Sequence, residues 1–244
     1  MRREQVLVET LVKLSDTLVD DYDIVDFMQR LAEACVTLLE VSAAGIMLAD
    51  SGGALRHIAC SSEEMRLVEL FELQVEEGPC FDAYAAKASV LCDSSERAVA
   101  LWPQFGSFAR ERGFAAVSAV PMRLRDDVVG ALNLFSATDG ALTVEDEQVA
   151  QAMADIATIG ILQHRAILDK GALATQLEAA LDSRVIIEQA KGVVAERLHV
   201  DVDEAFVIIR KYARDHNRLL TDTALQFVSG AISVDELSNV RRQG

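Results

Sequence analysis

The sequence predicts an α+β protein: an N-terminal module with an antiparallel sheet and flanking helices, a helical connector, and a C-terminal bundle of three short helices. Two pairs of apolar runs, each pair separated by turn-forming residues, predict hairpins over residues 43–61 and 115–135. From Thr143 onward the apolar residues recur at helical spacing. A chain of 244 residues is long enough for two such modules.

The first module opens with two predicted helices, over residues 4–19 and 24–40. Leucines of the first helix recur at alternating steps of four and three, which is typical of a helix that packs on another helix: Leu7, Leu11, Leu14 and Leu18. An apolar seam of this kind is unfavourable in water. We therefore expect this helix, together with the connector after Thr143, to join two copies of the chain in a homodimer.

Short elements are predicted between the two hairpins. A helix is expected over residues 63–73, and Gly78 and Pro79 break the chain before a second helix over 81–86. A short strand is expected at 90–92, and the stretch around Trp102 leads into a helix that ends near Gly113. The interleaved helices and strands predict a mixed module.

The connector begins with a capping signal and contains two residues that disfavour helix. Thr143 and Asp146 have the spacing of a capping box. Gly160 and Gly171 each lower helix propensity by about 1 kcal/mol relative to alanine, so we expect the helix to bend or break there. The domain boundary is accordingly predicted near residues 165–175.

The C-terminal segment divides into three helices. The first ends near Leu198, Asp201 and Glu204 cap the second, and the third starts near Thr221 and stops before Gly230. A bundle of this size has little room for a deep catalytic pocket, which favours a binding function over an enzyme.

Charge is distributed unevenly along the chain. The formal net charge of -16 argues against indiscriminate attraction to nucleic acid. Residues 171–244 contribute 9 Lys and Arg against 11 Asp and Glu, a net charge of -2, so most of the acidity lies in the first module. Residues 184–218 carry 7 basic against 6 acidic side chains. This segment is the least repulsive surface for a polyanion.

Cysteine spacing and hydropathy restrict the cellular setting. The four cysteines lie far apart, without the C-x-x-C spacing of a thiolate metal site: Cys35, Cys60, Cys80 and Cys92. We expect reduced thiols in the core and no metal. Charged residues interrupt every apolar stretch well before the ~20 residues that a membrane span requires. The expectation is a cytoplasmic protein with no membrane association.

Three segments near the C-terminus combine unrelated residue types at fixed offsets: SRVIIEQAKG at 183–192, DEAF at 203–206, and Arg210 followed by Asn217 and Arg218. The pattern resembles the ANTAR family of transcription antitermination regulators over about residues 175–232. This resemblance implies a three-helix domain that binds RNA stem-loops in nascent transcripts, generally as a dimer, and stabilises an antiterminator. Thr223 stands where the family more often has an aliphatic residue.

Candidate RNA-binding residues follow from this resemblance. Basic side chains on adjacent helices would hold phosphates, and two amides would read base edges exposed in a loop. The candidates are Arg184, Gln189, Lys191, Arg210, Arg214, Asn217 and Arg218. Without the resemblance, the same basic residues fit a solvated helix face. Tyr212 is interpreted as a core or rim residue, not as a base-stacking one.

The first module resembles a GAF domain over about residues 22–165. The resemblance rests on the order of elements, on EGP at 77–79, and on PMRL at 121–124 leading to VGALNL at 129–134. It implies a central antiparallel sheet and a pocket that in relatives holds cyclic nucleotides, haem or bilins. The Asn-Lys-Phe-Asp-Glu set linked to cyclic nucleotides is not recognisable, and His57 fits a packed residue better than a haem ligand. The cofactor and the signal are unknown.

The predicted organisation is a dimerisation helix (1–21), a GAF-like sensory domain (22–165), a helical connector (166–180), an ANTAR-like RNA-binding domain (181–232) and a tail (233–244). The predicted function is a dimeric, non-enzymatic antitermination regulator, controlled by a small-molecule ligand or partner of the GAF-like domain. Control by aspartyl phosphorylation is disfavoured, because a receiver domain would begin with a strand ending in paired acids.

Two other functions stay open. Small helical bundles also build DNA readers and protein-interaction modules. A cysteine-dependent GAF-type reductase is the less favoured alternative. It would need Cys60, Cys80 and Cys92 to converge around a thiolate of low pKa.

Overall fold

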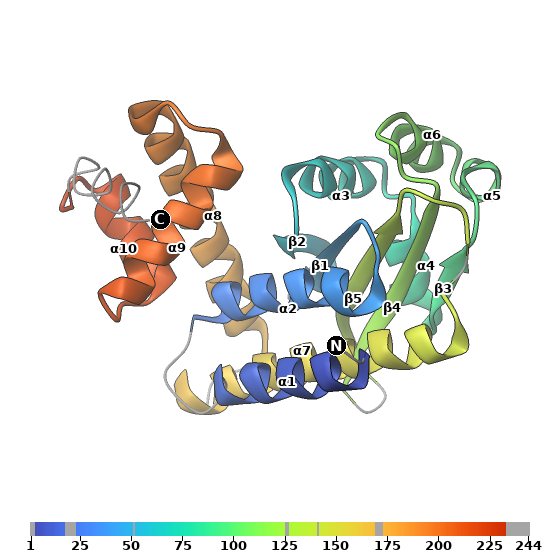
Figure 1. Ribbon diagram of the computed structural model, residues 1–244, viewed down its shortest axis with the longest axis horizontal. Coiled ribbons are helices and arrows are strands. Elements are labelled where there is room, and N and C mark those ends of the chain that lie inside the picture. Colours follow the sequence, from blue (N-terminus) through green and yellow to red (C-terminus); the bar gives the residue numbers. More distant parts are fainter. Residues whose placement is uncertain are drawn as a thin grey trace.

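The computed structural model describes residues 3–17, 23–50, 52–124, 127–140, 142–168 and 173–232. An N-terminal α+β module precedes a C-terminal bundle of helices, as the sequence predicts (Figure 1). The module contains one sheet, in the order β2-β1-β5-β4-β3, and every neighbouring pair is antiparallel. The strands are β1 (Ala43–Ala49), β2 (Leu55–Cys60), β3 (Val90–Cys92), β4 (Ala116–Leu124) and β5 (Asp127–Ser136).

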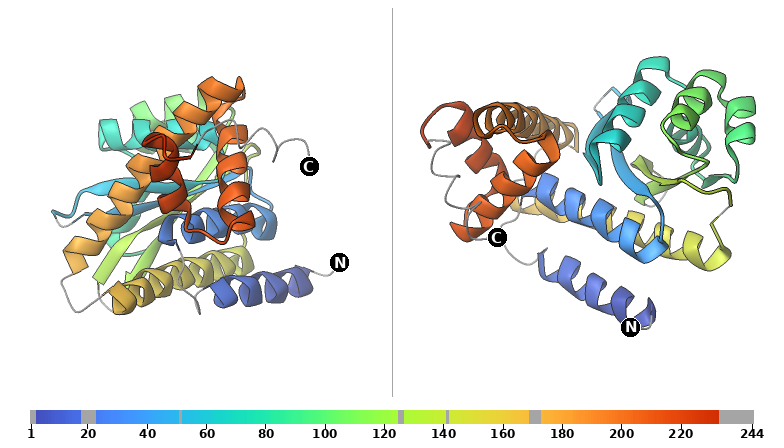
Figure 2. Two further views of the ribbon diagram at one scale, coloured as in Figure 1. Left: turned by 90° about the vertical axis from the view of Figure 1, so that its left-hand side faces the viewer. Right: turned by 45° about the horizontal axis from the view of Figure 1, so that its top comes forward.

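Helices cover both faces of this sheet, so that the module has three layers (Figures 1 and 2). Helices α2 and α7 pack on one face, and α3 and α4 pack on the other. The helices are α1 (Arg3–Thr17), α2 (Ile24–Leu39), α3 (Glu63–Val75), α4 (Pro79–Ala86), α5 (Ser95–Leu101), α6 (Pro103–Glu111) and α7 (Val144–Leu168). None of the helices among the described residues combines the length and apolar character of a membrane span.

Both hairpins are confirmed, and α5 is the element that sequence reasoning missed. Ser94 begins this short helix, because its hydroxyl accepts a hydrogen bond from the Arg97 N–H at 3.4 Å. Pro103 starts α6 directly afterwards, since proline suits the first position of a helix. Two short capped helices therefore stand where one was expected.

Helix α7 begins as predicted but does not break at Gly160. The Asp146 N–H donates to the Thr143 hydroxyl at 3.1 Å, and the Thr143 N–H donates back to the Asp146 carboxylate at 3.3 Å. A Cβ atom at Gly160 would collide with the fully buried ring of Phe27 in α2. The glycine therefore serves close helix packing, and the expected break there is wrong. Gly171 lies outside the described residues.

The leucines of helix α1 pack against the same chain. Leu14 is buried against the core, and Leu7 and Leu11 are partly buried beside it, while α1 packs on α2. Leu18 lies outside the described residues. Val8 and Val12 of the same helix stay 60% and 54% exposed.

The C-terminal bundle consists of α8 (Leu173–Leu198), α9 (Val202–Asp215) and α10 (Leu220–Val228). Asp201 caps α9, as predicted, by accepting from the Glu204 N–H at 2.7 Å. Tyr212 is buried in the bundle. Thr223 is also fully buried, and its hydroxyl donates to the Leu219 carbonyl at 2.9 Å, so that no polar atom is stranded.

The bundle lies against the N-terminal module. Helix α8 contacts α2 and β2, and α10 contacts α2. One cluster of buried apolar side chains extends from the sheet face under α2 and α7 into the bundle. We call the region where the two units meet the domain junction.

Candidate functional site

The domain junction separates the seven predicted RNA-binding residues into two groups. Three lie in the junction: Arg184, Lys191 and Arg210. Four are exposed: Gln189, Arg214, Asn217 and Arg218. The structure thus brings the first three to the acidic N-terminal module instead of presenting them to solvent.

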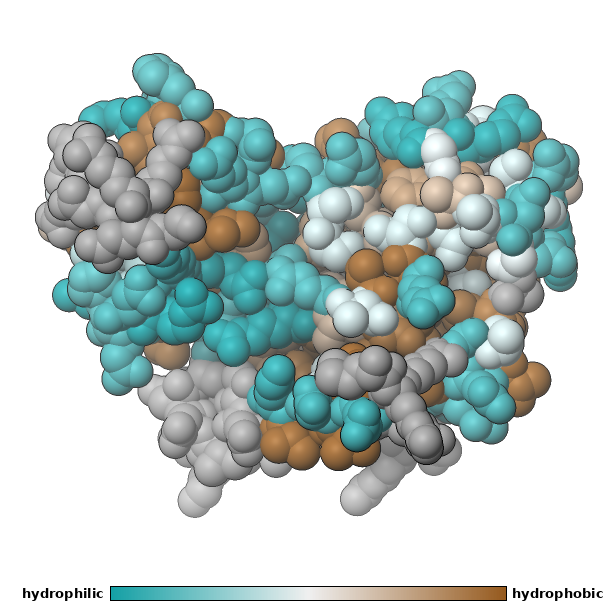
Figure 3. Space-filling view, viewed as in Figure 1, coloured by the Kyte–Doolittle hydropathy of each residue, from teal (hydrophilic) through white to brown (hydrophobic). Residues whose placement is uncertain are grey.

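Arg210 connects α9 to α2. Its Nε donates to Oδ1 of Asp26 at 2.8 Å, and its Nη1 donates to Oε1 of Glu33 at 2.7 Å. The surface over α2 and the adjoining part of the bundle is predominantly hydrophilic (Figure 3). Two carboxylates of α2 thus bind one guanidinium of α9.

Lys191 is buried on α8, with 4% of the residue exposed. Its Nζ donates to Oε1 of Glu188 at 3.1 Å and lies 3.7 Å from Oε2 of Glu63 in α3. The ammonium also lies 5.3 Å from the centre of the Phe206 ring. Carboxylates of both units therefore compensate its charge, as a buried ammonium requires.

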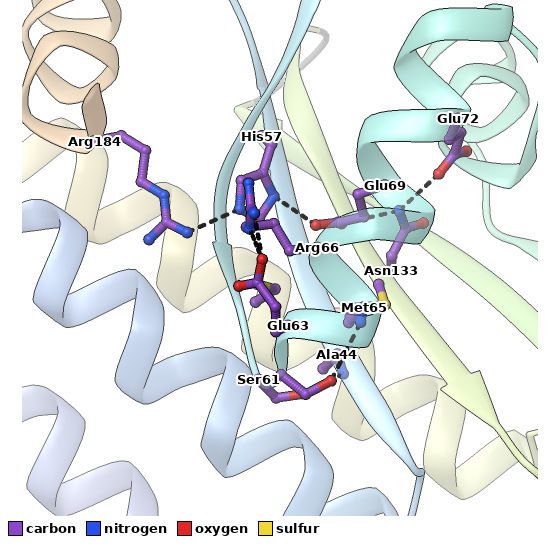
Figure 4. Close-up of polar contacts among 12 residues, drawn as sticks. Ala44, His57, Ser61, Glu63, Met65, Arg66, Glu69, Glu72, Asn133 and Arg184 are labelled. Atoms are coloured by element: carbon purple, nitrogen blue, oxygen red, sulfur yellow. Dashed lines mark hydrogen bonds and ion pairs between the residues drawn. The ribbon is translucent and has the colours of Figure 1, made fainter. Parts of the chain in front are cut away.

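Arg184 reaches the sheet from α8, and 5% of the residue is exposed. Its Nη2 lies 2.6 Å from Oε1 of Glu188 and 3.2 Å from Nε2 of His57 on β2 (Figure 4). An arginine can only donate, so His57 must accept at Nε2 and carry its proton on Nδ1. Nδ1 in turn lies 2.6 Å from Oε2 of Glu69.

Sequence reasoning missed Asp23 and Thr221, which join the two units at the N-terminal end of α2. Oδ1 of Asp23 caps α2 by accepting from the N–H groups of Val25 and Asp26 at 2.9 and 3.2 Å. Oδ2 accepts from the Thr221 N–H at 2.7 Å and from the Thr221 hydroxyl. Leu219 provides no side-chain cap for α10. Asp23 therefore caps a helix in each unit.

Three of the four exposed candidates lie at the end of α9. Arg214 has 68% of its side chain exposed. Asn217 follows with φ of +51°, a left-handed conformation that asparagine adopts more readily than most residues. Nη1 of Arg218 donates to Oε1 of Gln226 at 2.7 Å. Gln189 is exposed on α8 instead.

A polar network is buried inside the first module, on the side of the sheet that α3 covers (Figure 4). Nδ2 of Asn133 donates to Glu69 and to Glu72, each at 3.2 Å. Burial raises the pKa of Glu69 to about 8, raises the pKa of Glu72 well above its ordinary value, and lowers the pKa of His57. Burial thus disfavours the charged form of both carboxyls and of the imidazole. A Cβ at Gly45 would collide with the Glu69 carboxyl, so this glycine makes the network possible.

The cysteines do not have the properties of a redox site. All four are free and buried, as expected for reduced core thiols. Burial raises the pKa of Cys35 and of Cys60 to about 12, and it also raises the pKa values of Cys80 and Cys92. A nucleophilic thiolate requires the opposite shift, which argues against the reductase alternative.

Comparison with known proteins identifies both units. The family profile of the GAF domain matches residues 21–161, and that of the ANTAR domain matches residues 175–228. No curated protein matches the chain by sequence.

Solved structures share the fold of the first unit. The GAF domain of the phosphoenolpyruvate-protein phosphotransferase from Acinetobacter is 16% identical, with a TM-score of 0.54, over 71% of this chain and 99% of that one. The free methionine-R-sulfoxide reductase from Neisseria meningitidis is 17% identical, with a TM-score of 0.53, over 68% of this chain and 95% of that one. At such identities the likeness shows the fold alone.

An ANTAR domain indicates an RNA-binding antitermination regulator, and a GAF domain indicates a sensory module. The combination fits a regulatory protein without enzymatic activity. Since the matched GAF segment spans more than half of the sequence, the chain belongs to the GAF domain family and carries an ANTAR domain behind its sensory unit.

Proposed function

We propose that this chain acts as a homodimer that binds RNA stem-loops in nascent transcripts through its ANTAR domain, and that docking on the GAF domain restrains this binding. The observation that carries the proposal is the environment of Arg184, Lys191 and Arg210. Each of these predicted phosphate ligands is held at the junction by groups of the GAF domain.

Carboxylates of the GAF domain compete with RNA in this mechanism. Asp26, Glu33 and Glu63 lie where phosphate oxygens would contact the same cations. RNA that uses all seven predicted residues therefore requires the ANTAR domain to leave the junction. A signal received by the GAF domain activates RNA binding if it stabilises the open state more than the docked one.

Dimerisation is part of the proposal. Leu14 is occupied within the chain, but Val8 and Val12 leave an apolar stripe of α1 exposed and able to contact a second copy. Two linked ANTAR domains would bind paired stem-loops much more tightly than one stem-loop, through effective concentration. Sedimentation as a monomer at micromolar concentration would contradict this part.

The test uses Arg214, Asn217 and Arg218, which are exposed at the end of α9 while the ANTAR domain is docked. We expect Arg214→Ala with Arg218→Ala to weaken the binding of all stem-loops and to reduce the salt slope by ~0.7 to 0.9 per lost phosphate contact. Asn217→Ala should relax sequence preference with little change in that slope. Fluorescence anisotropy of labelled stem-loops at several salt concentrations measures both quantities.

The matched control is Arg110→Ala, which removes an exposed arginine of the GAF domain. Unlabelled duplex DNA serves as a competitor. If duplex DNA displaces the stem-loop at equal concentration, or if the double variant binds RNA as the parent does while folded, the proposed function is wrong.

A further inference from the structure

A cavity of about 800 Å³ lies at the domain junction, between β2 and α3 of the GAF domain and α8 of the ANTAR domain. The molecular surface is hollowed between the two units in Figure 3. The lining has an apolar part, formed by Leu70, Leu73 and Val185, and a cationic part. The cavity has the size and composition of sites that take small molecules.

Cations exceed carboxylates along this lining. The cationic part consists of Arg56, Arg66 and Arg184, whereas Asp50 and Glu188 supply the carboxylates. Both carboxylates already have partners: Asp50 lies 3.0 Å from Nε of Arg56, and Glu188 lies 2.6 Å from Arg184. Arg66 pairs with Glu63, so the anion-binding capacity of the lining rests on Arg184. His57 adds no charge, because it accepts a hydrogen bond from Arg184. The lining is therefore suited to an anion.

Arg184, which lines this cavity, has donors without a partner. Its Nη2 serves Glu188 and His57, but its buried Nε and Nη1 have no hydrogen-bond partner among the residues that the structure describes. Leaving a buried charged donor unsatisfied is unfavourable, because the group has lost its hydration without gaining an acceptor. An acceptor brought by a ligand would recover this free energy.

We propose that the cavity binds a small organic anion, whose carboxylate, phosphate or sulfonate group accepts hydrogen bonds from Arg184 and whose apolar part packs on Leu70, Leu73 and Val185. The site lies at the junction, and His57 in its lining connects it to the Glu69 and Glu72 network in the interior of the GAF domain.

The ligand acts as a clamp, because both units line its cavity. It binds the docked arrangement more tightly than the open one, and by linkage it must favour docking to the same extent. This regulatory consequence rests on the proposed function: an anion in the cavity weakens RNA binding. The binding step itself does not depend on RNA.

The experiment compares 1-naphthoate with its uncharged isostere 1-naphthamide by calorimetric titration of the full chain. We expect naphthoate to bind at least about tenfold more tightly than naphthamide. This ratio corresponds to ~1.4 kcal/mol, an energy at the low end for one charge-assisted hydrogen bond. Arg184→Gln should remove this preference, whereas Arg110→Gln on α6 should keep it.

A second variant separates loss of the site from loss of the fold. Val185 is 56% exposed, so Val185→Phe can occupy part of the cavity from its rim without burying a new polar group. We expect it to weaken naphthoate binding while circular dichroism and thermal unfolding match the parent protein.

Equal affinity for the two compounds, no naphthoate binding at millimolar concentration, or full binding by Arg184→Gln would overturn the site. RNA titrations with saturating naphthoate test the coupling: we expect weaker RNA binding, and an unchanged RNA affinity would refute the clamp. Failure to bind RNA with or without naphthoate would contradict the proposed function alone, because the naphthoate titration is performed without RNA.

Discussion

Replacing Asp26 by asparagine should release the ANTAR domain and tighten RNA binding. Asp26 accepts the Nε hydrogen bond of Arg210 at 2.8 Å, and its own side chain is 16% exposed. Asparagine retains the shape of the side chain but removes the charge that the guanidinium faces. The change therefore weakens the junction with little effect on the packing of α2.

The expected magnitude follows from this contact. A hydrogen bond to a charged group contributes about 1.5–3 kcal/mol, and the lower end applies because Asp26 also pairs with Arg30 at 2.7 Å and water reaches the site. A loss of about 1.5 kcal/mol shifts the ratio of docked to open molecules roughly tenfold. When the docked state predominates, the apparent affinity for RNA rises by the same factor.

The assay is stem-loop binding by fluorescence anisotropy at one fixed salt concentration, with hydrogen exchange of α9 as a readout of opening. Glu64→Gln is the matched control, because Glu64 also lies in the first turn of a GAF helix and is exposed, so the variant has the same change in net charge. We expect about tenfold tighter binding for Asp26→Asn than for Glu64→Gln. If the two folded variants bind RNA within twofold of each other, docking through Arg210 does not restrain RNA binding.

Two further predictions concern the GAF core. The raised pKa of Glu69 means that the folded state keeps a proton which the unfolded chain releases above about pH 4.5. Between pH 6.5 and 8, where the opposite contribution of His57 has ended, this one proton should make the free energy of unfolding fall as pH rises, by up to about 1.4 kcal/mol per pH unit. Glu72, whose pKa is also raised, adds a fall of the same sign. Urea unfolding measures this slope, and a slope that Glu69→Gln leaves unchanged would contradict the assignment. Gly160→Ala should destabilise the protein by about 1–3 kcal/mol through collision with Phe27, whereas Gly192→Ala, which has open space around it, should stabilise by up to about 1 kcal/mol. Equal effects of the two substitutions in urea unfolding would refute the packing argument.

Local signals were sufficient for most elements of the fold. The pairs Thr143 with Asp146 and Asp201 with Glu204 lie three residues apart, and both form the predicted caps. Short-range chemistry of this kind is visible in the sequence. At Gly160 helix propensity alone predicted a bend or a break, but the helix continues through this residue, because tertiary packing against α2 uses the glycine for close approach.

The composition of the candidate site was predictable only in part. Sequence reasoning named Arg184, Lys191 and Arg210, but it placed them on a surface open to RNA. Their partners are far away in sequence: Arg210 is 184 residues from Asp26, and Arg184 is 127 residues from His57. No periodicity connects such positions, and an isolated charge on a helix face fits solvent as well as an ion pair.

The buried carboxyls illustrate the same limit. Glu69 and Glu72 lie on a helix where a carboxylate is normally solvated, yet both are fully buried. Only the missing side chain of Gly45, on a strand, leaves room for Glu69. A glycine in a strand signals a close approach, but it does not indicate which group approaches.

The uneven charge of the chain bears on how the docked structure would meet RNA. A net charge of -16 repels RNA at long range, and most of it lies in the GAF domain. While Asp26, Glu33 and Glu63 hold the cations of the ANTAR domain, RNA meets this field and few free cations. In the proposed mechanism, opening the junction has two effects, since it frees the predicted phosphate ligands and lets them move away from the acidic surface. The salt dependence of RNA binding should therefore be steeper for the open Asp26→Asn variant than for the parent, because more phosphate contacts form in the open state.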